Sequence, residues 1–344
     1  MKRKVAILIE PKKFKIVEED IPQLQPHEIL IKVSAIGLCH SDMPTYFGEN
    51  AMGFDAYGNS TMISDIQFPT QVGHEAVGVV EEAGAAVTDF KVGDYVGGTP
   101  LTPGFASYIV APAAVCIPIP KTVPFEELKY CLAEPLMCVA NIVQAANPRL
   151  GDTVAVVGCG MMGLLSMAGL SHSGARKIIA VDVQDSRLEL AKKFGATDVI
   201  NPVTADLTAE VNRLTDNKGA DVVVEITGSL RGLKTALKVI RYGDFLGLAG
   251  RGKILIPSLY GREEKWDPDL GYELMFRSPI LHSTHPLYTE NYMETAKAGV
   301  EAYISGVLPL KELITHEFSL DDIQKGFDLM ESKDLSYLKG IIVP

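Results

Sequence analysis

The chain has 344 residues, of which 47% are hydrophobic and 22% charged, a balance typical of a globular protein with two domains or one large one. Its net charge of -11 argues against nucleic acid or an anionic membrane as a partner, because both would repel an acidic surface. The sequence shows no apolar run of membrane-spanning length, and its five cysteines lack the spacing of a small disulfide-bonded domain. We therefore expect no signal peptide, reduced thiols and a cytoplasmic location.

The first third of the chain is predicted to consist mainly of short β-strands. Strand-like alternation occurs in three early segments, 4–9, 14–18 and 29–33. Residues 46–68 show no clear period and are predicted to form a long loop. Beyond Pro124, apolar residues recur every three or four positions, which predicts a helix that contains Glu134-Pro135.

Strands and helices alternate from about residue 152 to residue 282. Predicted strands lie at 154–157, 178–181, 199–200, 221–226 and 245–248. This alternation is typical of a doubly wound parallel sheet, so the fold class is α/β. An amphipathic helix at 321–332 and a strand at 340–343 are expected to close the chain.

The junction after the strand 154–157 is the most informative stretch of the sequence. Three glycines follow at G-x-G-x-x-G spacing, Gly158, Gly160 and Gly163, with Met161 and Met162 between the last two. Such glycines permit a tight turn, a close approach of the backbone to a pyrophosphate, and close packing of the following helix on the strand. The first N–H groups of that helix would then face the phosphates. Alone, the triple is equally compatible with an ordinary glycine-rich turn.

A carboxylate at the end of the next strand supports the dinucleotide interpretation. Asp182 follows the strand 178–181 at the distance where an acidic residue accepts hydrogen bonds from a ribose diol. The same carboxylate would repel a 2′-phosphate. The sequence therefore predicts a site for NAD in preference to NADP.

A second group of residues has the chemistry of a metal site. Cys39, His74 and either Glu75 or Glu134 would give the thiolate, imidazole and carboxylate set of a catalytic zinc ion. Their spacing alone does not prove this. Each also has an ordinary interpretation, as a core thiol, a buried histidine or a surface carboxylate. Together, ahead of a predicted dinucleotide-binding segment, they favour a single catalytic metal centre.

The chain resembles the zinc-dependent medium-chain dehydrogenase/reductase family, and most of all its polyol and sugar-alcohol members of the sorbitol- and threonine-dehydrogenase type. The resemblance covers nearly the whole chain, and its motifs occur in family order: Gly37-x-Cys39-x-x-Asp42, Gly73-His74-Glu75-Ala76-Val77-Gly78, Val92-Gly93-Asp94-Tyr95-Val96, Glu134-Pro135-Leu136, Gly158 to Gly163 and Arg187-Leu188-Glu189-Leu190-Ala191. It implies a GroES-like, mostly β catalytic domain made of residues 1–147 and 284–344. A Rossmann dinucleotide-binding domain, residues 148–283, would be inserted between these two parts.

The resemblance also implies roles for the residues of the metal site. Cys39 and His74 would bind the catalytic zinc, and Asp42 would orient His74 by accepting its other ring N–H. Glu75 and Glu134 match positions that serve as a ligand, as an exchanging ligand or as a carboxylate behind the ligands in different members.

Further roles concern proton transfer and the cofactor. Ser41 would take the proton of the substrate alcohol, and His40 matches a position that approaches the pyrophosphate. Asp182 would hold the adenosine ribose, with Arg187 along the adenine or ribose edge. Positions that line the nicotinamide in the family are matched by Thr227, Leu248, Ala249, His282 and Ser283.

The chain departs from the family pattern in three places. The lobe that holds a structural zinc in many relatives is reduced to residues 97–104, which contain no cysteine, so we expect no structural zinc. Pro44 stands where some relatives end their proton relay at a histidine. The segments 46–69 and 260–270 are longer than usual and would shape a polar pocket, contact a second subunit or simply be solvated. Further pocket candidates are Tyr46, His282, His285 and Tyr288, each of which also fits an ordinary structural position.

The expected function is oxidation of a secondary hydroxyl of a polyol, sugar or cyclitol with NAD, or reduction of the ketone. Two alternatives stay open: a zinc-free quinone or enoyl reductase of the same fold, and a non-catalytic NAD(H)-binding protein. The first leaves Cys39 and His74 unexplained, and the second predicts cofactor binding without turnover. By analogy with relatives, we expect a homodimer or homotetramer.

Overall fold

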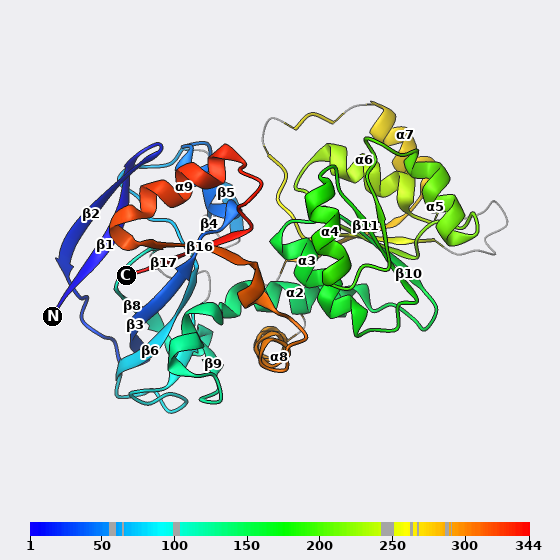
Figure 1. Cartoon of the computed structure of the whole chain (residues 1–344). Coiled ribbons are helices and arrows are strands. Elements are labelled where there is room, and N and C mark those ends of the chain that lie inside the picture. Colours follow the sequence, from blue (N-terminus) through cyan, green and yellow to red (C-terminus); the bar gives the residue numbers. More distant parts are fainter. Residues whose placement is uncertain are drawn as a thin grey trace. The chain divides into compact units, whose positions relative to one another are not determined.

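The computed structural model describes residues 1–54, 60–63, 65–98, 104–241, 251–261, 264–266, 268–285, 289 and 291–344 (Figure 1). The chain divides into two compact units. The first consists of Met1–Leu136 together with Leu310–Pro344, and the second of Met137–Pro309. No helix within the described ranges is long and apolar enough to cross a membrane.

The first unit is built on a seven-stranded sheet. Six of its strands follow the order β16-β17-β3-β6-β7-β9, and the seventh, β8, pairs with β3 outside this order. Their bounds are β3 (Glu28–Gly37), β6 (Glu75–Ala83), β7 (Tyr95–Gly97), β8 (Tyr108–Pro112), β9 (Ile117–Ile119), β16 (Ile314–Ser319) and β17 (Lys339–Val343). A separate antiparallel hairpin is formed by β1 (Lys2–Glu10) and β2 (Lys13–Asp20). The strands expected in the first third of the chain and at its end are therefore present.

The core of the first unit lies beneath the helix α9 (Ile323–Ser332). Phe327 of this helix packs against the rings of Phe14, Tyr46 and Phe105, all within 5.8 Å between centroids. Tyr46 is fully buried, and its hydroxyl donates to Asp328 Oδ1 at 3.0 Å. Tyr46 is therefore a core residue, and the expectation that it lines a pocket was wrong.

The expected long loop after residue 46 contains regular structure. A short helix, α1 (Met43–Tyr46), precedes it, and β4 (Ala51–Phe54) pairs with β5 (Ser60–Ile63) as an antiparallel hairpin. The sequence pattern does not reveal this hairpin, because its strands have only four residues each. Four residues are too few to establish a period of two.

The second unit is a six-stranded parallel sheet with the order β12-β11-β10-β13-β14-β15. The strands are β10 (Thr153–Val157), β11 (Lys177–Val181), β12 (Asp198–Ile200), β13 (Val222–Glu225), β14 (Lys253–Ile256) and β15 (Ile280–Ser283). The helices are α3 (Met161–Ser171), α4 (Asp185–Lys193), α5 (Leu207–Thr215), α6 (Leu230–Val239), α7 (Pro268–Arg277) and α8 (Tyr292–Ile304). All five residues of β10 are buried, as its unbroken apolar sequence predicts for a central parallel strand. The doubly wound α/β fold is confirmed, while the strand expected at 245–248 lies outside the described residues.

The limits of the two units differ from the domain limits expected at 147/148 and 283/284. One limit falls inside the helix α2 (Ala133–Ala146), and the other falls at 309/310. Hydrogen bonds join the two additional segments, 137–147 and 284–309, to each other. Asn141 Nδ2 donates to the carbonyl of Thr284 at 3.2 Å, and Thr295 Oγ1 donates to Gln144 Oε1 at 3.1 Å.

Candidate functional site

Three side chains that could hold a metal ion converge where two neighbouring strands meet. β3 ends at Gly37 and β6 begins at Glu75, and these two residues are partners in the antiparallel register. Cys39 therefore follows one strand closely and His74 immediately precedes the other. One potential ligand atom each from Cys39, His74 and Glu75 lies within 4.8 Å of the other two. Cys39 lies at least 35 positions before His74 and Glu75 in the sequence, and the pairing of β3 with β6 brings the three residues together.

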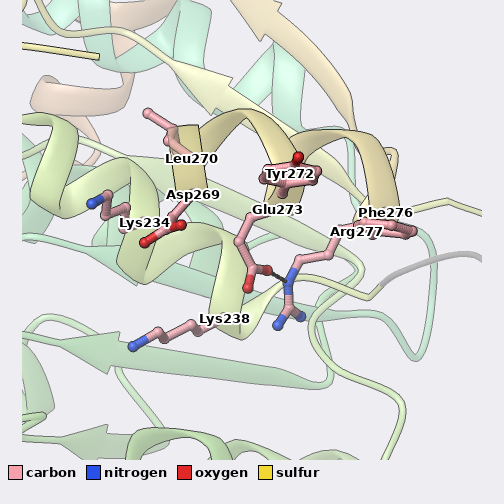
Figure 2. A pocket seen from close by; sticks show the side chains of 8 residues that line it. All are labelled: Lys234, Lys238, Asp269, Leu270, Tyr272, Glu273, Phe276 and Arg277. Atoms are coloured by element: carbon pink, nitrogen blue, oxygen red, sulfur yellow. Dashed lines mark hydrogen bonds and ion pairs between the residues drawn. The ribbon is translucent and has the colours of Figure 1, made fainter. Parts of the chain in front are cut away.

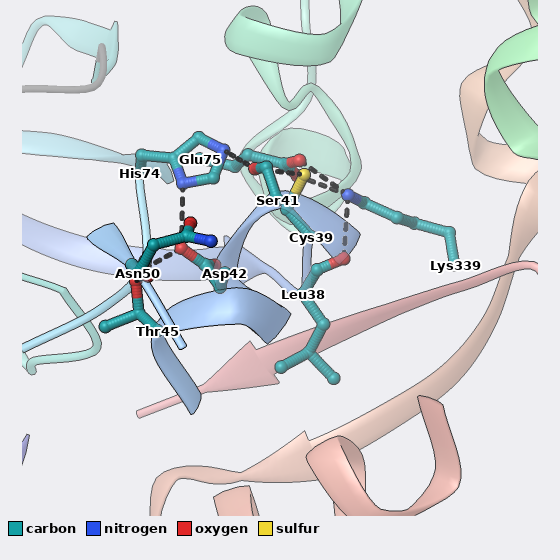
Figure 3. A network of polar contacts seen from close by, with 10 residues as sticks. Leu38, Cys39, Ser41, Asp42, Thr45, Asn50, His74, Glu75 and Lys339 are labelled. Atoms are coloured by element: carbon teal, nitrogen blue, oxygen red, sulfur yellow. Dashed lines mark hydrogen bonds and ion pairs between the residues drawn. The ribbon is translucent and has the colours of Figure 1, made fainter. Parts of the chain in front are cut away.

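The orientation of His74 is set by a carboxylate behind it (Figure 3). Its Nδ1 lies 3.1 Å from Asp42 Oδ1, and the same oxygen accepts the backbone N–H of Gly73 at 3.1 Å. His74 Nε2 is left facing Ser41 Oγ at 3.2 Å, and Ser41 donates to Cys39 Sγ at 3.1 Å. Burial would lower the pKa of His74, but the facing Asp42 and Cys39 together raise it well above its usual value. The outward ring nitrogen, the thiol and the Ser41 hydroxyl thus meet at one point.

The carboxylate of Glu75 is held by a lysine from the last strand. Lys339 Nζ donates to Glu75 Oε1 at 2.7 Å and lies 2.5 Å from Oε2, which makes no hydrogen bond among the described residues. The ammonium also donates to the carbonyl of Leu38 at 2.9 Å. Although burial opposes its charge, Glu75 and Cys39 raise the pKa of Lys339. Lys339 was missed in the sequence, where the only signal is a lysine heading the apolar run Gly340-Ile341-Ile342-Val343.

Glu134, the other candidate carboxylate, lies in the first turn of α2 and is buried. Within the described part of the chain, the group of side chains able to hold a metal ion contains Glu75 and not Glu134. The donor set of sulfur, nitrogen and oxygen fits zinc, which takes such ligands in catalytic sites. Asp42 supplies the support behind a histidine ligand that these sites require.

The three glycines of the second unit occupy different environments. Gly158 has a φ of +105°, which favours glycine, and a Cβ on Gly163 would lie 2.0 Å from the Gly158 carbonyl oxygen. A Cβ on Gly160 would meet no protein atom within 4 Å. Met161 and Met162 begin α3 directly after this turn. The backbone therefore needs two of the glycines for its own geometry, and the third leaves open space in front of the helix N-terminus.

Asp182 lies against this glycine turn. Its Oδ2 accepts the backbone N–H of Cys159 at 2.7 Å, and its Oδ1 accepts that of Gln184 at 2.8 Å. Arg187, in the first turn of α4, interacts electrostatically with Asp182, and desolvation lowers its pKa. The carboxylate, the guanidinium and the turn thus lie close together.

The other predicted cofactor residues lie in different parts of the structure, and not all of them are near the glycine turn. Thr227 follows β13 and lies beside the turn, because a Cβ on Gly158 would be 3.0 Å from Thr227 Cγ2. His282 and Ser283 lie on β15 and are exposed. His40 is exposed in the first unit, where desolvation and Lys339 lower its pKa. Leu248, Ala249 and the pocket candidate Tyr288 lie outside the described residues.

A surface hollow of about 740 Å³ lies elsewhere on the second unit, beside α6 and α7 (Figure 2). Arg277 forms an ion pair with Glu273 there, and the rings of Tyr272 and Phe276 stack with their centroids 6.4 Å apart. None of its lining residues belongs to the predicted site.

Comparisons with known proteins identify one family domain in each half of the chain. The family model described as alcohol dehydrogenase GroES-like domain matches residues 25–121, and that described as zinc-binding dehydrogenase matches residues 162–258. The L-threonine 3-dehydrogenase of Caldanaerobacter subterraneus subsp. tengcongensis is 30% identical over 342 residues, covering 92% of this chain and 91% of the relative. The chain is a zinc-type medium-chain dehydrogenase. Members of this family act on CH–OH groups and bind zinc and NAD(P), so the predicted family, fold and class of enzyme are confirmed.

Further proteins are similar to this dehydrogenase in sequence or in fold. The sorbitol dehydrogenase of Bacillus subtilis is 27% identical, covering 99% of this chain and 97% of the relative. Among solved structures, an oxidoreductase/dehydrogenase of unknown specificity from Escherichia coli has a TM-score of 0.82 at 25% identity, covering 100% of this chain and 99% of that one. The 2R,3R-butanediol dehydrogenase of Bacillus subtilis has the same fold, with a TM-score of 0.79 at 24% identity and 99% coverage of both chains.

Proposed function

We propose that this dehydrogenase oxidises a secondary hydroxyl of a polyol, sugar or cyclitol with NAD, or reduces the corresponding ketone. The observation that carries the proposal is the convergence of Cys39, His74 and Glu75 in a chain of the zinc-type family. The names of its relatives, sorbitol dehydrogenase and D-xylulose reductase among them, support this substrate class. No cysteine occurs in the segment 97–104, so one catalytic zinc ion and no structural one is proposed.

In this proposal Cys39 and His74 hold the zinc ion, and Glu75 or Glu134 supplies a carboxylate. When bound, zinc acts as a Lewis acid that lowers the pKa of an alcohol. Ser41 is placed to accept the hydroxyl proton of the substrate, because its Oγ lies within hydrogen-bonding distance of both Cys39 Sγ and His74 Nε2. Asp42 fixes the ring of His74, so that the histidine needs no reorientation during the reaction.

The proposed cofactor is NAD, held at the glycine turn with Asp182 on the adenosine ribose. Replacing Asp182 with serine is expected to lower kcat/KM for NAD by about 10-fold, the effect of losing charge-assisted hydrogen bonds. The value of kcat/KM for NADP should change little, because the loss of these hydrogen bonds is offset by removal of the charge that repels its 2′-phosphate. Steady-state kinetics with both cofactors measure the ratio. An unchanged NAD/NADP ratio would show that Asp182 does not select the cofactor.

The function itself is tested by measuring NADH formation across a panel of polyols, cyclitols and amino alcohols. Turnover of at least one secondary alcohol is expected, with zinc bound to the purified protein. Cofactor binding without turnover across the panel would favour a non-catalytic NAD(H)-binding protein. Reduction of quinones or enones by the metal-free protein would favour a zinc-free reductase.

A homodimer or homotetramer is proposed as the assembly. β15 ends the described part of the six-stranded sheet, and Ile280 and Leu281 on it are each 46% exposed. An exposed apolar edge strand is a surface that native proteins usually cover. Light scattering would contradict the proposal if it gave the mass of a single chain at micromolar concentration. A cytoplasmic location is also proposed, supported by the five cysteines, all of which are free.

A further inference from the structure

Lys339 is the first residue of β17, and its side chain is almost completely buried, as is that of Glu75. A lysine is rarely buried to this degree unless it is paired. The register explains how it reaches the metal-binding group. β17 pairs antiparallel with the end of β3, where Ile341 lies opposite Gly37, and Gly37 in turn lies opposite Glu75.

The contacts of Lys339 join the two segments that carry the predicted ligands. Its ammonium donates to the carbonyl of Leu38, the residue before Cys39, and to the carboxylate of Glu75, the residue after His74. Figure 3 shows the ammonium between these two groups. A role in stability alone is a weak explanation, because the desolvation of a buried ion pair offsets much of its attraction.

The carboxylate has little freedom to move away from this contact. A Cβ on Gly37 would lie 1.8 Å from Glu75 Oε2, so the carboxylate packs directly against the Gly37 backbone. One of its oxygens nevertheless lies within 4.8 Å of the ligand atoms of Cys39 and His74. The same carboxylate therefore faces a buried cation on one side and the predicted metal position on the other.

We propose that Lys339 is a positioning residue that competes with zinc for the Glu75 carboxylate and so prevents Glu75 from becoming a permanent ligand. If the carboxylate moves fully onto the metal, the buried ammonium keeps the Leu38 carbonyl as its one hydrogen-bond acceptor among the described residues.

 Leaving a buried ammonium with so few acceptors is energetically costly, and this cost keeps a coordination position of the metal available for substrate. This inference rests on the proposed function, since it requires zinc at Cys39 and His74.

The test is the rate at which zinc passes from the holoprotein to a chelator. In Lys339→Met the carboxylate has no competing cation, so we expect zinc release at least about 10-fold slower than in the wild type, the scale of effect seen for residues behind metal ligands. Lys339→Arg keeps the charge and should stay close to the wild-type rate. Release from Lys339→Met as fast as, or faster than, from the wild type would overturn the inference, because that is the result of a purely structural role.

A second variant keeps the inference testable if Lys339→Met does not fold. Glu75→Gln/Lys339→Met removes both charges, so no unpaired ion is left in the protein interior. Its zinc release should stay within about threefold of the wild-type rate. In the wild type the Glu75 carboxylate is held by Lys339 and contributes little to metal retention, so little is lost with it. Release about 10-fold faster would identify Glu75 as a permanent ligand and overturn the inference.

The wild-type zinc content, measured in the same series, distinguishes failure of the proposed function from failure of the inference about Lys339. A wild-type protein that binds no zinc overturns both the proposed function and this inference. A zinc-containing wild type with fast release from Lys339→Met overturns the inference alone.

Discussion

Replacement of Cys39 by alanine is expected to remove the bound zinc and to lower kcat/KM for the alcohol substrate by about 1,000-fold or more. Cys39 provides the only thiol of the group formed with His74 and Glu75 within the described residues. Without it, one imidazole and one carboxylate shared with Lys339 are left to hold the metal. Zinc analysis and steady-state kinetics on the same preparation measure both effects.

The control for this variant is Cys116→Ala. Cys116 is a buried thiol of the first unit whose Sγ donates to the carbonyl of Pro112 at 3.4 Å, so its loss affects packing and not the metal-binding group. It should retain zinc and activity. NAD affinity should be unchanged in both variants. Full activity in Cys39→Ala would refute the assignment of Cys39 as a ligand.

Replacement of Gly160 by alanine is expected to weaken NAD binding by about 5- to 150-fold, the equivalent of the about 1–3 kcal/mol that an extra methyl group costs in a tightly packed contact. The added Cβ meets no protein atom within 4 Å, and the backbone at Gly160 has a φ of -72°, which alanine adopts without strain. The melting temperature of the cofactor-free protein should therefore stay at the wild-type value. The new methyl group would occupy the space through which the backbone approaches the pyrophosphate.

Gly163→Ala serves as the contrasting variant. Its Cβ would lie 2.0 Å from the Gly158 carbonyl oxygen, so the melting temperature itself should fall. Isothermal titration with NAD and thermal denaturation without it separate the two effects. Wild-type NAD affinity in Gly160→Ala would contradict the placement of the cofactor at this turn.

The second unit was the part of the fold most readily predicted from the sequence. Its signals are local: the apolar run of β10, the glycine turn and Asp182 lie within one strand–helix–strand segment and need no distant contact to be interpreted. The final helix was expected at 321–332 and spans Ile323–Ser332, because its apolar residues recur with a clear helical period.

The predictions that failed depend on long-range packing. The Tyr46 side chain is of a type often found in pockets, but α9, almost 280 residues later in the chain, covers it. Asp328 and Gln324 of that helix hydrogen-bond its hydroxyl.

 The hairpin of β4 and β5 is too short for its alternation to be recognised. Such contacts are decided by tertiary structure and leave little trace in a local pattern.

The candidate site was predicted in part. Residue types identified Cys39, His74 and two carboxylates, but spacing could not choose between Glu75 and Glu134. The pairing of β3 with β6 places Glu75 in the group. Lys339 enters through the pairing of β17 with β3, a contact between the two ends of the chain that no local motif indicates.

The most direct test of the proposed function is a measurement of NADH formation from a polyol before zinc removal, after it, and after zinc is restored. We predict one zinc ion per chain in the purified protein, loss of activity on chelation and recovery of activity when zinc is restored. Undiminished NADH formation by the metal-free protein would contradict it.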